Sequence, residues 1–130
     1  MANYPARNSG DQTINYLRAP FTFTQGNSGI VQVGTLPAGA VVLRAYVVIN
    51  TVFNAGTNNF LKVGIVGSDA SIFSTVTLTA LGIINATGVL TAATTITPVV
   101  DTQVIATSLM TGTVATTGSA FIIVEFCPMA

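Results

Sequence analysis

Charge is what this chain has least of. Only 6% of its 130 residues are charged, and four Lys or Arg stand against four Asp or Glu, so the formal net charge is zero. An ordinary soluble domain carries about 25% charged residues. A chain without a basic stripe has little with which to neutralise phosphates or to hold an anionic lipid surface. We therefore expect neither a nucleic acid nor a membrane among its partners.

Histidine is absent, and with it the usual general base and the most common metal ligand. The single cysteine, Cys127, cannot form an intrachain disulfide, and we interpret it as a small hydrophobic residue. A Ser–Lys dyad that uses Lys62 remains as a catalytic alternative, but no Gly-x-Ser-x-Gly motif accompanies it. The carboxylates are scattered and fit turns and solvated faces: Asp11, Asp69, Asp101 and Glu125. The sequence thus predicts no enzyme, no catalytic residue, no metal and no cofactor.

Long hydrophobic runs are missing as well. Polar residues such as Arg44, Asn50 and Lys62 interrupt the most apolar region, so no stretch reaches the roughly 18 apolar residues of a membrane-spanning helix. The first ten residues hold no apolar segment of the kind a secretory signal needs, which predicts synthesis in a cytoplasm. The length suits a single domain with its own core.

What the chain has in abundance is Thr, Val and Ile beyond Pro20, and these residues favour a pleated sheet over a helix. The clearest strand is predicted over 41–53, where one alternating face is expected to form the core: Val41, Leu43, Ala45, Val47, Ile49, Thr51 and Phe53. The turn-like sequence after it and the apolar alternation over 60–66 predict an antiparallel hairpin between these two strands.

Further strands are predicted over 21–24, from residue 30 onward, and over 74–80, 99–107 and 120–126. Glycine, asparagine and proline turns separate them, and no long amphipathic helix is expected. Residues 81–98 fit no single pattern. Seven or eight short strands of this kind predict a sandwich, a jelly roll or a small barrel.

The first 19 residues differ from the rest because they hold three of the eight charged residues among Asn, Gln, Ser and Gly. We expect an extended N-terminal arm over 1–19 and a β domain over 20–130. Tyrosine and arginine are over-represented at the energetic centres of interfaces. The candidate partner-interface residues of the arm are Tyr4, Pro5, Arg7, Tyr16 and Arg18.

The expected strand faces carry threonine rows and few charges, whereas soluble β proteins use charged edges to prevent association of their sheets. Such surfaces are tolerated where an assembly buries them. The low charge therefore indicates a protein that works inside an assembly, as a homo-oligomer.

Four segments combine a turn with a strand: 34–42 (GTLPAGAVV), 50–57 (NTVFNAGT), 61–64 (LKVG) and 117–126 (TGSAFIIVEF). In these segments the chain resembles small capsid decoration, or cement, proteins and related head proteins of tailed bacteriophages. The resemblance implies a β-sandwich or jelly-roll fold and does not extend to residues 1–19. Together with the arm expected from composition, it predicts an all-β fold: a single-domain antiparallel β-sandwich, jelly-roll-like, with an extended N-terminal arm. It also implies oligomers seated on the capsid lattice and no catalysis.

On this basis we expect a virion protein, made in the cytoplasm of a host bacterium, whose partners are the major capsid protein and further copies of itself as a dimer or trimer. It would bind the outside of the capsid and stabilise the lattice. The alternative within the virion is a head-fibre base, a tail or an adsorption module. A carbohydrate-binding module is the alternative outside it, but sugar-binding platforms favour aromatic rings and the chain has no tryptophan.

Overall fold

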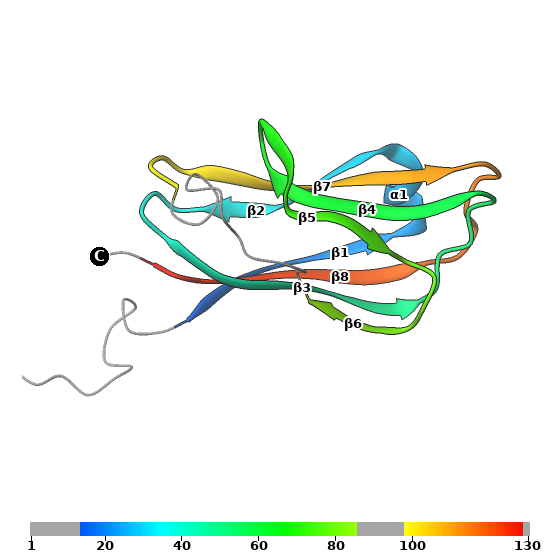
Figure 1. Cartoon of the computed structure of the whole chain (residues 1–130), viewed down its shortest axis with the longest axis horizontal. Helices are drawn as coiled ribbons and strands as arrows, with labels where there is room; N and C mark the ends of the chain where they lie inside the picture. The colour runs from blue at the N-terminus through cyan, green and yellow to red at the C-terminus, as the bar shows by residue number, and fades with distance from the viewer. Residues whose placement is uncertain (1–13, 86–97, 129–130) are drawn as a thin grey trace, which may run out of the picture.

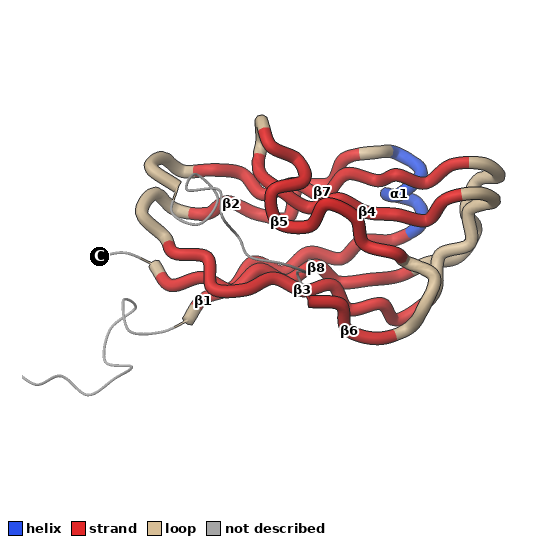
Figure 2. The backbone as a smooth tube through the Cα atoms, in the orientation of Figure 1, coloured by secondary structure: helices blue, strands red, loops and turns tan. Residues whose placement is uncertain are grey.

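The computed structural model describes residues 14–85 and 98–128. Within these ranges the chain forms two four-stranded antiparallel sheets that pack face to face (Figure 1). Strands account for most of the described residues, with one short helix beside them (Figure 2). The expected all-β sandwich is confirmed.

The described elements are few and short, as the sequence predicts. In chain order they are β1 (Asn15–Thr22), α1 (Phe23–Ser28), β2 (Ile30–Leu36), β3 (Val41–Thr51), β4 (Asn58–Ile65), β5 (Ser68–Thr77), β6 (Gly82–Asn85), β7 (Thr102–Thr111) and β8 (Ser119–Cys127). In the described part of the chain, no helix is long and apolar enough to cross a membrane.

The strand order is β1-β8-β3-β6 in the first sheet and β2-β7-β4-β5 in the second. The pairing is nested, because β1 pairs with β8, β2 with β7, β3 with β6 and β4 with β5, always antiparallel. This order is jelly-roll-like: it arises when one long hairpin is rolled up into two sheets. Neither sheet is built from a continuous stretch of sequence, so each depends on the other for its connections.

The core lies between the sheets and follows from period-2 alternation. Strand β8 shows it without interruption, since Ala120, Ile122 and Val124 are fully buried while the residues between them face outward. From the opposite sheet, Leu61 and Val63 of β4 are equally buried. Burying a side chain of this size contributes about 1.5–3 kcal/mol, so the facing strands are held mainly by these contacts.

The core face predicted for 41–53 is right in its centre but wrong at its start and at Thr51, which is exposed beside a second irregularity in the pairing with β8. Ala45, Val47 and Ile49 are buried, but Leu43 is 45% exposed and Val42 is buried in its place. The cause is an irregularity in the pairing with β8, where Val42 and Arg44 oppose consecutive residues and Leu43 is the extra residue. Such a bulge reverses the alternation on one side of it.

The hairpin predicted between 41–53 and 60–66 is wrong. Strand β3 pairs with β8 and β6, whereas β4 pairs with β7 and β5 in the other sheet. The connecting segment 52–57 therefore crosses between the layers instead of turning within one. Sequence proximity favours a hairpin, but β3 and β4 each take their partners from later strands of the chain.

Strand ends also differ from the prediction: the strands expected over 74–80 and 99–107 occupy Ser68–Thr77 and Thr102–Thr111. Residues 23–28, expected to end a strand and begin a turn, form helix α1. The backbone N–H of Thr22 donates to Oε1 of Gln25 at 2.9 Å, an arrangement typical of a helix start. The helix stops at Gly29, which has a φ of 110°.

The domain boundary expected after Ala19 falls inside β1, which begins at Asn15 and pairs with β8 along its whole length. The reason is an inward–outward alternation that the polar residues obscure in the sequence. Ala19 and Phe21 are buried, while Tyr16, Arg18 and Pro20 face outward. Residues 15–19 thus belong to the sandwich. The rest of the predicted arm, residues 1–13, lies outside the described residues.

Candidate functional site

The outer side of the β1-β8-β3-β6 sheet gathers the residues best suited to bind a partner. The pairing register aligns them in three rows that run across the strands. In the first row Tyr16 lies opposite Glu125, and Glu125 lies opposite Arg44. We call this surface the tyrosine–arginine face, and its members are Tyr16, Arg18, Pro20, Arg44, Tyr46, Val48, Ile83, Phe121, Ile123 and Glu125.

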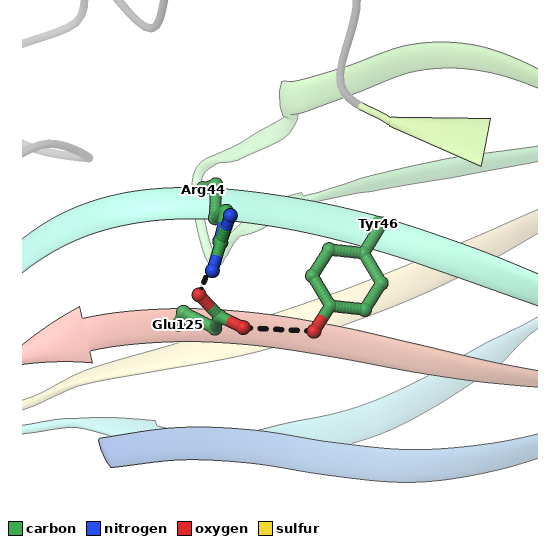
Figure 3. Close-up of polar contacts among 3 residues, drawn as sticks. All are labelled: Arg44, Tyr46 and Glu125. Atoms are coloured by element: carbon green, nitrogen blue, oxygen red, sulfur yellow. Dashed lines mark hydrogen bonds and ion pairs between the residues drawn. The ribbon is translucent and has the colours of Figure 1, made fainter. Parts of the chain in front are cut away.

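The charged centre of this face is Glu125 on β8. One carboxylate oxygen accepts a hydrogen bond from Nε of Arg44, and the other accepts one from the hydroxyl of Tyr46 at 2.8 Å (Figure 3). Both partners come from the neighbouring strand β3 (Figure 3). The side chain of Glu125 is only 14% exposed, whereas that of Arg44 is 67% exposed. The carboxylate is therefore satisfied within the sheet, while the guanidinium faces solvent.

The electrostatics of the cluster follow from these two contacts. Hydrogen bonds from Arg44, and then from Tyr46, hold the pKa of Glu125 below its ordinary value, although partial burial opposes the shift. The same hydrogen bond raises the pKa of the Tyr46 hydroxyl, and that of Arg44 rises as well. At neutral pH the cluster is thus a carboxylate, a guanidinium and a neutral phenol.

The second guanidinium of the face belongs to Arg18 on β1. Its Cζ atom lies 4.0 Å from the centroid of the Phe121 ring. A cation over an aromatic face at this distance gains about 0.5–1 kcal/mol at an exposed site. The ring contact positions the guanidinium over Phe121, and the described hydrogen bonds assign its N–H donors no acceptor within the sheet.

Apolar area surrounds these polar groups. Ile83 on the edge strand β6 is 65% exposed and Tyr16 on the edge strand β1 is 62% exposed, so the face is apolar at both sides. Between them Val48 and Ile123 are half-buried. The surface therefore combines exposed aromatic and aliphatic area with two oriented guanidinium groups.

The opposite outer face, on the β2-β7-β4-β5 sheet, has a different composition. Lys62 pairs with Asp69 at 2.8 Å, and the amides of Gln32 and Gln103 are 3.4 Å apart. Exposed threonines of β5 and the half-buried Phe60, Ile105 and Leu109 also lie on it. Lysine, aspartate and small polar residues are depleted at interface centres, whereas tyrosine and arginine are enriched. The two outer faces are thus chemically distinct.

Of the candidate interface residues expected from the sequence, the structure places Tyr16 and Arg18 together on the tyrosine–arginine face. Tyr4, Pro5 and Arg7 lie outside the described residues. Sequence reasoning missed the cluster of Arg44, Tyr46 and Glu125. Alternation along 41–53 already puts Arg44 and Tyr46 on one side of their strand, but the partnership with Glu125 depends on a register between distant segments.

The arrangement suits binding better than catalysis. Over residues 14–85 and 98–128 no group of three or more His, Cys, Asp or Glu side chains could hold a metal ion. Glu125 is the only carboxylate of the face, and its depressed pKa makes it a poor proton donor or acceptor near neutral pH. Oriented donors and apolar area remain, which are the elements of a protein interface.

Comparisons with known proteins agree with this architecture. A chain from the capsid of Ralstonia phage GP4 is 19% identical with a TM-score of 0.66, covering 100% of this chain and 92% of that one. A chain from the acid-stable capsid of Helicobacter pylori bacteriophage KHP30 is 16% identical with a TM-score of 0.64, covering 89% of each. A chain from the capsid asymmetric unit of cyanophage Pam1 is 25% identical with a TM-score of 0.56, covering 88% of this chain and 82% of that one.

No protein-family model matches the chain, and a comparison with curated proteins gives no match either. The similarity therefore lies in the fold, and it extends over nearly the whole length of the chains compared. All three of these similar chains come from phage capsids.

Proposed function

We propose that this chain is a structural protein of a phage virion that binds the outside of the capsid as a homo-oligomer and stabilises the lattice of the major capsid protein. The observation that carries the proposal is the match of its sandwich, over 88–100% of its length, to chains of three phage capsids. The resemblance of its turn and strand segments to decoration proteins supports the position on the outside.

The role is structural, without catalysis. The tyrosine–arginine face holds donors and apolar area, and its carboxylate is engaged by Arg44 and Tyr46. These features support attachment to another protein surface. They provide no nucleophile with an adjacent base.

Stabilisation follows from mass action. A protein that binds the assembled lattice and not its separated subunits lowers the free energy of the assembled state by an amount that grows with its concentration relative to Kd. Several copies joined in one oligomer add avidity, because each further contact forms at a high effective concentration.

Self-association is supported by exposed aliphatic residues outside the tyrosine–arginine face. Val66 is 59% exposed at the β4–β5 turn, and Val99 and Val100 are 82% and 65% exposed before β7. With only 6% charged residues to keep copies apart, contact between copies is favoured. The native mass of the purified protein tests this, and a monomer at high concentration would contradict it.

The test of function is co-sedimentation with empty shells of the virus that encodes the chain, prepared without it. We expect saturable binding and a higher temperature of shell disruption. Electron microscopy of the decorated shells gives the position: lattice-wide density supports the proposal. Density at a single vertex or on a tail would favour the head-fibre or tail alternative, and absence of binding would refute both.

The N-terminal residues Tyr4, Pro5 and Arg7 are part of this proposal as additional contacts to the shell. Because β1 begins at Asn15, the informative deletion removes residues 1–13. A deletion to residue 19 would take most of β1 and leave β8 without one of its partners. We expect the shorter deletion to keep the sandwich folded and to weaken shell binding, and full occupancy after deletion would exclude the arm from the contact.

A further inference from the structure

We infer that the tyrosine–arginine face is the surface that docks on the shell, and that it docks on a carboxylate-bearing surface of the shell protein. The inference rests on the proposed function and adds to it which of the two sheets faces the shell and what chemistry it meets there. The observation behind it is that this face presents oriented guanidinium donors and no accessible carboxylate.

The distribution of residue types distinguishes the two sheets. Among the described residues both arginines, Arg18 and Arg44, and both tyrosines, Tyr16 and Tyr46, belong to the β1-β8-β3-β6 sheet and share its outer face. The described lysine, Lys62, is on the other sheet and is paired with Asp69. Tyrosine and arginine are enriched among the residues that dominate binding energy at interface centres, whereas lysine and aspartate are depleted at interfaces.

The chemistry of the face excludes an identical face as its occupant. Glu125 is 14% exposed and accepts from both Arg44 and Tyr46, so its oxygens are engaged inside the sheet. The Arg44 side chain is 67% exposed and uses Nε for that contact, so its terminal nitrogens are not needed for the bond to Glu125. Two copies of this face would bring guanidinium groups together without accessible carboxylates between them, and like charges in contact are costly.

The two guanidinium groups are also held in place before any partner arrives. Arg44 is fixed by Glu125, and Arg18 is stacked on Phe121. Planar guanidinium donors match carboxylates in a paired geometry, and donors that are already oriented lose less entropy on binding. A shell surface with carboxylates beside apolar area is therefore the complementary partner.

A matched set of variants tests the face and its charge preference. Ile83 on β6 and Ile30 on β2 are edge-strand residues of opposite sheets with 65% and 63% exposure, so they are equivalent in size and accessibility. The set is Ile83→Glu, Ile83→Arg and Ile30→Glu, each checked for folding by circular dichroism and for native mass. Binding to empty shells is then measured by co-sedimentation at several salt concentrations.

We expect Ile83→Glu to weaken binding about tenfold or more, because the new carboxylate would face the carboxylates of the shell surface and repel them. Ile83→Arg should bind at least as well as the unaltered protein at low salt and lose affinity more steeply as salt rises. Ile30→Glu should bind like the unaltered protein.

Other results would overturn the inference. Equal weakening by Ile83→Glu and Ile83→Arg would exclude the carboxylate preference, and unchanged binding of Ile83→Glu would exclude the face. Weakening by Ile30→Glu alone would place the contact on the other sheet. A lower native mass of Ile83→Glu would show that the face joins copies of the chain. If the unaltered protein does not bind shells, the proposed function is refuted, and this result is independent of the variants.

Discussion

Replacing Asn59 by alanine is expected to destabilise the sandwich by about 3 kcal/mol. Among residues 14–85 and 98–128, Asn59 is the only buried residue with a polar side chain, with 7% exposure. Its Oδ1 accepts from the backbone N–H of Ala55 at 2.7 Å, and its Nδ2 donates to the carbonyl of Ala55 at 2.9 Å. The side chain thus fixes segment 52–57 where it crosses between the sheets.

The magnitude follows from the groups that lose their partners. Alanine at position 59 leaves both the N–H and the carbonyl of the buried Ala55 without these hydrogen bonds, at about 1–2 kcal/mol each. Asn54→Ala is the control, because the amide of Asn54 makes three hydrogen bonds to Thr116 and Thr117 at an exposed site. Water replaces those bonds, so we expect a loss of about 0.5–1 kcal/mol.

The assay is urea unfolding followed by circular dichroism, since the chain has no tryptophan for fluorescence. A shift of the midpoint at unchanged slope gives the change in stability. For a chain of this size a loss of about 3 kcal/mol corresponds to roughly 10–15 °C in Tm. If Asn54→Ala costs as much stability as Asn59→Ala, burial of the hydrogen-bonded groups does not determine the loss, and the expected difference between the two sites is refuted.

Two further changes test local geometry and charge. Gly118→Ala should lower the free energy of unfolding in urea by about 2–3 kcal/mol, because its φ is 144° and an added Cβ would lie 2.3 Å from the Phe53 ring. Gly29→Ala, at a φ of 110° with open space around it, should lower it by about 1 kcal/mol. Equal losses would show that the contact with the Phe53 ring does not contribute. Glu125→Gln should be less stable than the unaltered protein above pH 4.5, the ordinary pKa of the group. Because the pKa of Glu125 is lower in the folded state, the difference in free energy of unfolding should shrink as the pH falls below 4.5 and through the folded-state pKa. A difference that stays constant between pH 7 and pH 3 would show that the charge of Glu125 does not contribute to stability.

Local alternation made most of the strands predictable. Strand β8 was expected over 120–126 and spans Ser119–Cys127, because each inward residue is apolar and no irregularity interrupts it. The centre of β3 was predictable for the same reason. The reversal at Leu43 was not, since a bulge is set by the pairing with β8 and leaves no mark on the period of β3 itself.

Long-range register explains what the sequence could not reveal about the site. Tyr16 and Arg18 can be selected from the sequence as residue types that favour interfaces. Polar neighbours obscure their alternation with the buried Ala19 and Phe21, so the sequence predicts an arm where the structure has the start of β1. Arg44 and Glu125 are far apart in the chain and become partners only because β8 lies between β1 and β3. A prediction from local patterns has no access to that order.

The central position of β8 in its sheet has a consequence for how the protein is made. On the ribosome, β1 and β3 are synthesised long before β8, and in the finished sheet each of them is bonded to β8 and not to the other. Until β8 emerges, both strands expose unpaired edges and an uncovered apolar side, a state prone to aggregation. Closing the sheet late, between segments distant in sequence, also makes folding slow. The emergence of the last strand, β8, is therefore the step that allows the first sheet to close.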